Sequence, residues 1–453
     1  MARLVLASNR VPAAADRGVK SGGLVSALGE VISGGLWFGW SGQVAKGAPT
    51  KAQLRRARGT VYATIDLTQE QYDRYYVGFA NSTLWPLLHF RLGLMEFDRA
   101  QYEAYLSVNR AFAAALAPLI KPGDIVWVHD YHLIPLGGFL RELGITNKLA
   151  FFLHVPFVPP SMYSVLPKGS ELLAALCAYD LVGVQTITDL RNLLDCVREL
   201  LGRPVDDMGR VQTNGHQARF GAFPIGIDSV GFARMAEESA AGADGKRLGE
   251  SLGRRALVMG VDRLDYSKGL PNRFEGFARM LGRWPEWRSK VTYVQIAARS
   301  RDDVPQYRTI RRELDQMAGR INGRFGAIDW VPLRYLNRPV PRGTLAGYYR
   351  FARVGLVTPL RDGMNLVAKE YVAAQDPENP GILVLSRFAG AMHELGEALL
   401  VNPYDPDEIA EALDTALRLP LDERRERWRR MWDRIREDDA ASWCRNFLTV
   451  LAA

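Results

Sequence analysis

The chain has 453 residues, of which 47% are hydrophobic and 24% charged, and its formal net charge is +8. This composition is typical of a globular protein of two or three domains and excludes a chain too polar to bury a core. No segment reaches the roughly 18 uninterrupted apolar residues of a membrane-spanning helix, and the N-terminus lacks the apolar run of a signal peptide. We therefore expect a cytoplasmic protein with no membrane contact.

The sequence gives little support to a metal site or a nucleic-acid interface. The cysteines lie far apart, lack zinc spacing and fit reduced thiols: Cys177, Cys196 and Cys444. His129 and His132 have no third nitrogen or sulfur ligand nearby in the sequence. The basic cluster Arg424–Arg430 is interleaved with acidic residues, which is typical of a solvated helix face. We expect no cofactor, no metal and no nucleic-acid partner.

Short apolar runs alternate with helical stretches along almost the whole chain, as in α/β proteins. Several runs are continuous rather than alternating, which favours parallel strands buried on both faces. The predicted strands are Leu4–Ala7, Ile125–Val128, Leu149–Leu153 and Leu181–Val184 in the first half, and Ala256–Gly260, Val291–Ile296, Gly355–Val357, Ile382–Leu385 and Leu399–Val401 in the second. We predict two doubly wound domains whose ligands bind at the carboxyl ends of the strands.

The segments without a strand pattern suggest the domain limits. Residues 237–254 are rich in Ala, Gly and Glu, and the chain from Leu421 to Ala453 has a helical pattern of apolar residues. We predict a first Rossmann-like domain at 1–232, a second at 233–430, and a C-terminal helix at 431–453 that packs back on the first domain.

Polar residues follow each predicted strand of the first half. Ser8-Asn9-Arg10 comes after the first strand, and Gly22 and Gly23 then open a helix where backbone N–H groups can approach a ligand. A plain flexible loop is the alternative there. Asp130 stands between His129 and His132 after the next strand, and His154 follows the one after that. A lone histidine at a strand end is often structural, but this group on neighbouring strands favours a ligand-binding cleft.

The second half has cations and carboxylates at its strand ends. Arg263 and Lys268 flank a turn and could clamp a diphosphate in bidentate fashion. Asp362 and Glu370 would lie about 12 Å apart along a helix axis. The helix start between them, near Met364–Val367, offers free N–H groups and a partial positive charge. This set fits a sugar nucleotide, and a bare strand-to-helix turn is the alternative.

Seven motifs, in this order along the chain, resemble those of the trehalose-6-phosphate synthases: SNR…SGGL, GLWFGWSG, YY…LWP, HDYHL, DRLDYSKGLP, GRINGRFG and TPLRDGMNLVAKEYVAAQ. The resemblance implies a retaining glycosyltransferase of GT-B fold, with two facing Rossmann-like domains and the active site in the interdomain cleft. It also implies glucose transfer from a nucleotide donor, usually UDP-glucose, to glucose 6-phosphate. The products would be α,α-trehalose 6-phosphate and the nucleoside diphosphate, and a homo-oligomer is expected.

The same resemblance implies roles for the matching residues. Those implied at the reaction centre are Asp130, His154, Arg263, Lys268 and Asp362. Those implied for donor binding are Gly22, Gly23, Arg263, Lys268, Asp362, Met364, Asn365, Leu366, Val367 and Glu370. Those implied for acceptor binding are Arg10, Trp40, Tyr76, Trp85, Asp130 and Arg301. The loop Tyr335–Arg342 lies where the family meets the nucleobase, but it is variable, so the preferred base (UDP, GDP or ADP) is left open.

Other functions compete with this one. A related transferase with another phosphorylated acceptor, such as glycerol 3-phosphate, is disfavoured by the complete set of acceptor residues. A catalytically silent sugar-phosphate sensor would usually lack a phosphate cation or the acidic helix residue, and both kinds are present. A nicotinamide dehydrogenase would need a glycine fingerprint that the sequence lacks.

The reaction route is a further hypothesis. Asp130, Asp362 and Glu370 each have another implied role, which leaves no carboxylate to attack the sugar from the face opposite the leaving group. We predict front-face transfer with retention and no covalent intermediate. We also predict no need for a divalent metal, because the cations and the helix start supply positive charge. Asp405-Pro406-Asp407 reads as a helix cap rather than a metal ligand.

Overall fold

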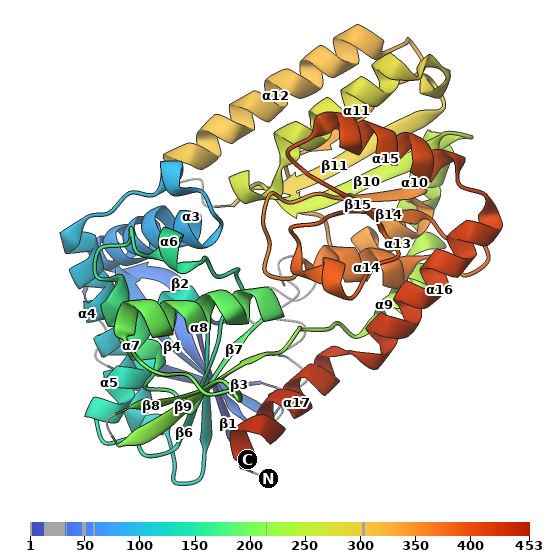
Figure 1. Ribbon diagram of the computed structural model, residues 1–453. Coiled ribbons are helices and arrows are strands. Elements are labelled where there is room, and N and C mark those ends of the chain that lie inside the picture. The colour runs from blue at the N-terminus through green and yellow to red at the C-terminus, as the bar shows by residue number, and fades with distance from the viewer. Residues whose placement is uncertain are drawn as a thin grey trace. The chain divides into compact units, whose positions relative to one another are not determined.

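The computed structural model describes residues 2–12, 32, 34–47, 51–57, 59–213, 215–300 and 304–453 (Figure 1). Contacts divide the described chain into two compact units. One contains the described residues up to Pro224 together with Trp443–Ala453, and the other contains Ile225–Ser442. The domain boundaries at residues 232 and 430, which the sequence suggested, remain a prediction.

The first unit is built on a nine-stranded sheet of order β3-β4-β2-β1-β5-β6-β7-β9-β8, parallel except for its two edge pairs, β3–β4 and β8–β9. The strands are β1 (Leu4–Arg10), β2 (Leu36–Ala45), β3 (Gln53–Ala57), β4 (Thr60–Thr68), β5 (Ile125–His129), β6 (Lys148–Phe152), β7 (Leu181–Val184), β8 (Arg210–Thr213) and β9 (His216–Ala222). The central strands β5, β6 and β7 are almost wholly buried, as strands covered on both faces must be.

Helices of the first unit follow the strands in the manner of a doubly wound fold (Figure 1). A π-helix, η1 (Tyr72–Leu84), precedes the short helix α3 (Trp85–Leu88). The others are α2 (Gln69–Gln71), η2 (Leu92–Leu94), α4 (Arg99–Leu116), η3 (Ala117–Leu119), η4 (Tyr131–Leu133), α5 (Leu136–Glu142), α6 (Pro160–Tyr163), α7 (Gly169–Leu176), α8 (Ile187–Leu201) and the chain-terminal α17 (Ala440–Ala452).

Aromatic packing ties the last helix to this unit. Trp127 of β5 is fully buried and stacks on Phe447 of α17 with ring centroids 4.4 Å apart. Trp443 lies 5.0 Å from Trp127, and its indole N–H donates to the carbonyl of Phe223. Each such pair contributes about 0.5–1.5 kcal/mol beyond the apolar area that it buries. The end of the chain therefore belongs to the core of the first unit.

The second unit contains a six-stranded sheet of order β12-β11-β10-β13-β14-β15, in which all neighbours are parallel. The strands are β10 (Ala256–Arg263), β11 (Val291–Ala298), β12 (Leu333–Leu336), β13 (Val354–Val357), β14 (Ile382–Ser386) and β15 (Leu399–Val401). Chain order reverses between β10 and β13, which is the point where ligands bind in open α/β sheets.

Helices cover both faces of this sheet (Figure 1). On one face lie α11 (Leu270–Arg283), α12 (Pro305–Phe325) and α15 (Pro406–Arg418), and on the other lie α9 (Ser229–Ala240), α13 (Arg342–Phe351) and α14 (Leu366–Ala374). The remaining elements are α10 (Ala243–Leu252), η5 (Tyr266–Lys268), η6 (Pro285–Trp287), η7 (Gly390–His393) and α16 (Leu421–Glu437). None of the described helices combines the length and apolarity needed to span a membrane.

The predicted α/β class and every predicted strand are confirmed, but six strands were missed: β2, β3, β4, β8, β9 and β12. The search for continuous apolar runs finds strands that are buried on both faces. Strand β4 alternates between buried and half-buried residues, and the edge strand β3 is largely exposed. These partly solvated strands lack the continuous pattern.

Two smaller predictions have clear outcomes. Asp405 caps α15, because its carboxylate accepts from the backbone N–H of Asp407 at 2.9 Å, as predicted. The prediction of a solvated basic face on α16 is wrong for Arg424. This residue is 8% exposed, and its guanidinium donates to the carbonyl of Pro380. Arg430 does lie at the surface, paired with Glu426.

Candidate active site

Residues of the first unit meet where β1 and β5 end. Chain order reverses between these two strands, and Ser8 pairs in register with His129. The N–H of Trp37 donates to the hydroxyl of Ser8 at 2.8 Å, and that hydroxyl donates to the carbonyl of Arg10 at 3.0 Å. The strand end that carries the exposed Arg10 is thereby held in place.

The side chain of Arg10 lies over a glycine. Gly42 has φ +88°, a conformation that other residues rarely adopt, and a Cβ added there would lie 2.7 Å from Nε of Arg10. The positive φ favours glycine at this position, and its missing side chain leaves the guanidinium of Arg10 room to lie against the backbone.

Aromatic rings form a continuous cluster beside this strand end. Trp40 lies 5.7 Å from Tyr76, and Tyr76 lies 5.4 Å from Tyr72 and 5.8 Å from His132. The rings of Tyr76 and His132 are stacked, with 12° between their planes. The sequence had placed Trp40 and Tyr76 together, whereas Tyr72 was missed although it lies one helical turn before Tyr76.

Trp85 joins the same cluster through other rings. It is 4% exposed and lies 3.9 Å from His89 and 5.6 Å from Tyr131. Tyr131 in turn contacts His132 at 3.9 Å between ring centroids. Trp85 therefore shares a buried aromatic layer with residues that contact Tyr76.

Asp130 and His154 also come together. Asp130 has φ +75°, an uncommon conformation for an aspartate, and its carboxylate accepts from the backbone N–H of His154 at 3.3 Å. The ring of His154 contacts Nδ1 of His129 at 3.1 Å and the side-chain amide of Gln185 at 3.3 Å. Both ring nitrogens of His154 thus have protein partners.

Burial keeps these histidines neutral. It lowers the pKa of His154 to about 3, and burial together with the nearby His154 lowers the pKa of His129 well below its usual value. Gln185 was missed by the sequence, although it directly follows β7 and the rule of polar residues at strand ends would have found it.

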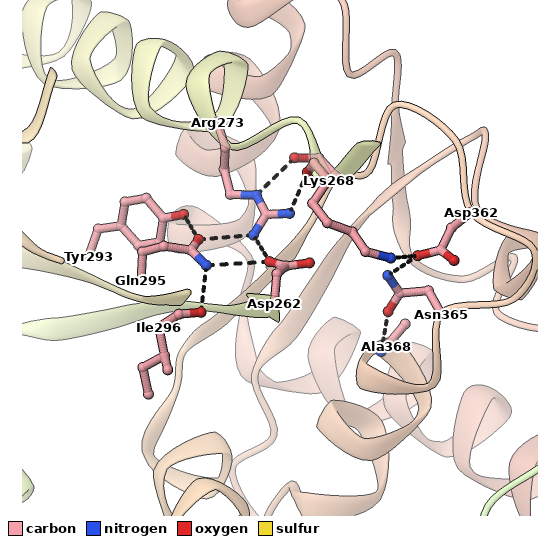
Figure 2. A network of polar contacts seen from close by, with 10 residues as sticks. Asp262, Lys268, Arg273, Tyr293, Gln295, Ile296, Asp362, Asn365 and Ala368 are labelled. Atoms are coloured by element: carbon pink, nitrogen blue, oxygen red, sulfur yellow. Dashed lines mark hydrogen bonds and ion pairs between the residues drawn. The ribbon is translucent and has the colours of Figure 1, made fainter. Parts of the chain in front are cut away.

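In the second unit, Lys268 and Asp362 form an ion pair at the β10–β13 switch point (Figure 2). Lys268 Nζ lies 2.5 Å from Asp362 Oδ2, and the amide of Asn365 donates to the same oxygen at 2.9 Å. The two charged side chains are only 12% and 15% exposed. Arg263, the last residue of β10, is exposed.

Helix α14 begins beside this pair. Asn365 is its N-cap, with φ +83°, and its side-chain oxygen accepts from the N–H of Ala368 at 3.2 Å. The carbonyl of Met364 accepts from the N–H of Ala391, which fixes the backbone before the helix. Leu366 and Val367 open the helix, so the predicted helix start is confirmed, and its free N–H groups form a positive helix end.

Glu370 pairs with Arg342 at 3.2 Å, a contact that the sequence did not predict. Burial raises the pKa of Glu370, and Arg342 opposes that shift. Arg342 is the last residue of the loop expected near the nucleobase, so this loop ends beside Glu370.

Lys369, next to Glu370 on α14, has an interior position instead. Its side chain is fully buried, lies 2.6 Å from a carboxylate oxygen of Glu394 and donates to the carbonyl of Ile225 at 2.7 Å. Neighbouring residues of one helix therefore have different ion-pair partners, Glu394 for Lys369 and Arg342 for Glu370.

Gly22, Gly23 and Arg301 lie outside the described residues. Within the described ranges, no group of three or more His, Cys, Asp or Glu side chains could hold a metal ion. The cysteines there are free and buried.

A sequence profile of glycosyltransferase family 20 matches residues 8–453. The chain belongs to glycosyltransferase family 20. A trehalose-6-phosphate synthase of Sinorhizobium fredii is 49% identical over 461 aligned residues, covering 100% of this chain and 99% of the relative.

Solved structures of family 20 are similar over the full length. An α,α-trehalose-phosphate synthase (UDP-forming) from Burkholderia xenovorans, in complex with glucose-6-phosphate, matches with a TM-score of 0.97 and 44% identity, covering 100% of both chains. An Escherichia coli structure bound with UDP-2-fluoro glucose matches with a TM-score of 0.94 and 43% identity, covering 99% of both chains. Both units therefore have the fold of GT-B enzymes of this family.

Proposed function

We propose that this chain transfers glucose from UDP-glucose to glucose 6-phosphate with retention, giving α,α-trehalose 6-phosphate and UDP. The observation that carries the proposal is the group at the β10–β13 switch point. There a lysine, a carboxylate and a helix start lie together in a chain of family 20. Such a group provides a cation and N–H donors for phosphates and a carboxylate for sugar hydroxyls.

Donor binding exchanges partners within this group. Lys268 and Arg263 hold the diphosphate, together with the backbone from Met364 to Val367. Because Lys268 is paired with Asp362, we expect a phosphate oxygen to take the place of the carboxylate as its partner. Asp362 then accepts hydrogen bonds from glucose hydroxyls, and Glu370 accepts from the ribose. Gly22 and Gly23 close over the donor.

Acceptor binding belongs to the residues of the first unit. Arg10 and Arg301 pair with the 6-phosphate, Tyr76 and Trp85 help to grip it, and Trp40 and Asp130 lie beside the sugar ring. The aromatic cluster supports this part of the proposal, because aromatic faces suit the apolar face of a sugar ring.

His154 is proposed to contact the glucose of the donor. Its ring is neutral, and both of its nitrogens already have partners in His129 and Gln185. A donor hydroxyl therefore competes for one of these hydrogen bonds rather than meeting a charged ring.

The bond forms on the front face without a glycosyl-enzyme. Each candidate nucleophile has a partner: Asp130 accepts from the N–H of His154, Asp362 pairs with Lys268, and Glu370 pairs with Arg342. The diphosphate leaves stabilised by Arg263, Lys268 and the helix start, and its oxygen takes the proton of the incoming hydroxyl. Intact-protein mass spectrometry with a slow fluorinated donor tests this step, because a stable glycosyl adduct contradicts it.

Product analysis tests the overall proposal. The chain is incubated with glucose 6-phosphate and with UDP-, GDP- or ADP-glucose, and nucleoside diphosphate release and product stereochemistry are measured. We expect UDP release and an α,α-linked product. Faster transfer to glycerol 3-phosphate would favour a related transferase, and donor binding without turnover would favour a sugar-phosphate sensor.

A homo-oligomer and a cytoplasmic location complete the proposal. The free, buried cysteines Cys177, Cys196 and Cys444 support a reducing compartment. Sedimentation of the purified chain tests the oligomer, and fractionation of cells tests the location.

A further inference from the structure

A fully buried arginine lies behind the cationic loop of the second unit. Arg273 belongs to the first turn of α11, its side chain has no solvent exposure, and no role follows for it from the family motifs quoted above. A buried charge is strongly unfavourable unless it is paired and its hydrogen-bond donors are satisfied. Its partners therefore indicate what it does.

Four groups accept hydrogen bonds from this one guanidinium (Figure 2). Nη1 donates to Asp262 at 2.6 Å and to Gln295 at 3.0 Å. Nε donates to the hydroxyl of Thr358 at 3.1 Å, and Nη2 donates to the backbone carbonyl of Lys268 at 3.2 Å. Asp262 is the penultimate residue of β10, Gln295 lies within β11 and Thr358 directly follows β13, so Arg273 joins three strands to one loop.

The two ends of this loop are Asp262 and Lys268, and Arg273 contacts both. Asp262, whose carboxylate accepts from Arg273, directly precedes Arg263 in the chain. Lys268, whose backbone carbonyl accepts from Arg273, directs its ammonium group towards Asp362 on the other side (Figure 2). One side chain thereby contacts both the residue before Arg263, whose own backbone pairs with Ala298 of β11, and the backbone of Lys268.

A second residue supports the middle of the loop. Asp265 accepts from the N–H of Ser267 at 2.9 Å and from the hydroxyl of Tyr307 at 2.9 Å. The carbonyl of Ser267 accepts from the N–H of Leu360 at 2.8 Å. Tyr307 and Leu360 therefore hold the middle of the loop, and Arg273 contacts both of its ends.

We propose that Arg273 is a positioning residue that fixes the spacing of Arg263 and Lys268, and thereby the affinity for the nucleoside diphosphate of the donor. Because Asp262 neutralises its charge, its effect is geometric rather than a long-range attraction of the anion. The inference rests on the proposed function, since it assigns the two cations to that diphosphate.

The test compares Arg273→Lys with Arg279→Lys. The first change keeps a cation beside Asp262 but cannot reach all four acceptors. The control lies on the same helix, where Arg279 makes surface ion pairs with Glu275 and Asp407. UDP affinity is measured by calorimetry, the KM of donor and acceptor by kinetics, and stability by thermal unfolding.

We expect Arg273→Lys to weaken UDP binding and to raise the donor KM by about tenfold, with the acceptor KM unchanged. Arg279→Lys should leave all three values unchanged. A lost hydrogen bond should change UDP affinity by more than about twofold. If folded Arg273→Lys binds UDP within about twofold of wild type, the inference is overturned. A merely structural role would lower thermal stability without this split between donor and acceptor.

A second variant decides the matter if Arg273→Lys does not fold. Thr358→Val keeps the shape of the side chain and the Arg273–Asp262 ion pair but removes one acceptor. We expect the UDP affinity of this variant to fall about threefold. If Thr358→Val binds UDP as tightly as wild type, the inference is overturned. The proposed function stands in that case as long as the wild-type chain turns over its substrates. A wild type that binds no UDP would overturn both.

Discussion

The two units place polar residues at equivalent points of their sheets but build them from different chemistry. At the β1–β5 switch point the interactions are between rings and neutral groups: Trp40, Tyr76 and His132 pack together, and His154 lies between His129 and Gln185. At the β10–β13 switch point, by contrast, cations meet carboxylates in Lys268–Asp362 and Arg273–Asp262.

This difference shows how each site meets a ligand. In the second unit the cations are paired with carboxylates, so an anion competes with a carboxylate for Lys268. In the first unit the buried histidines are neutral, so a ligand meets uncharged rings there, beside the exposed Arg10 and the carboxylate of Asp130. Charge exchange should dominate one site and shape and hydrogen bonding the other.

Removing Lys268 should have the largest effect. Lys268→Ala leaves Asp362 without its cation beside an incoming diphosphate. We expect UDP affinity, measured by calorimetry, to fall by about ten- to a hundredfold. Lys290→Ala, which removes an exposed lysine at the opposite end of the sheet, should change nothing. Equal affinities for the two variants would remove Lys268 from the donor site.

Protonation should reveal the neutral character of the first site. His154 has a folded-state pKa of about 3, below its ordinary value near 6.5, so the unfolded state binds more protons between these values. Stability is therefore lost as pH falls from about 6.5 towards 3. At pH 5 this loss is about 2 kcal/mol relative to pH 7.5.

Denaturant unfolding of His154→Gln at the two pH values measures this contribution. The loss between pH 7.5 and pH 5 should shrink by about 2 kcal/mol. His393→Gln, which replaces an exposed histidine, should behave as wild type. An unchanged pH dependence in His154→Gln would mean that the ring is protonated in the folded chain.

Changing the exposed cation of the first unit should have a smaller effect. Arg10→Ala removes one partner of the acceptor phosphate, and we expect the KM for glucose 6-phosphate to rise by about fivefold to tenfold. UDP affinity should not change, and free glucose should remain a poor acceptor. Arg56→Ala, on the exposed edge strand β3 of the same sheet, is the control. A change in UDP affinity instead would show that Arg10 acts on the donor.

Removing metal should have the smallest effect of all. If paired cations and the start of α14 supply the positive charge, excess chelator should leave turnover unchanged. The steady-state rate with and without chelator measures this. Loss of activity that magnesium or manganese restores would contradict the role given to the second site.

The sequence predicted those features that depend on local patterns. Continuous apolar runs identified the strands buried on both faces, and polar residues after them located Arg10, Asp130, His154, Lys268 and Asp362 at strand ends. The Asx cap of α14 was not predicted, although Asn365 stood in the quoted motif directly before the helix start and asparagine is a favoured N-cap residue.

What the sequence alone determined was the α/β class, the continuous strands and the side of each sheet at which charges gather. Hydrophobic periodicity and the polar residues that end each strand depend only on residues close together in the chain, so they can be read from the sequence. The tertiary structure decided the partners. Lys268 and Asp362 lie 94 residues apart in the chain, and Arg342 and Glu370 lie 28 apart, yet each pair is in direct contact. Their contact depends on strand order, and strand order follows from packing of the whole sheet, which no local pattern contains.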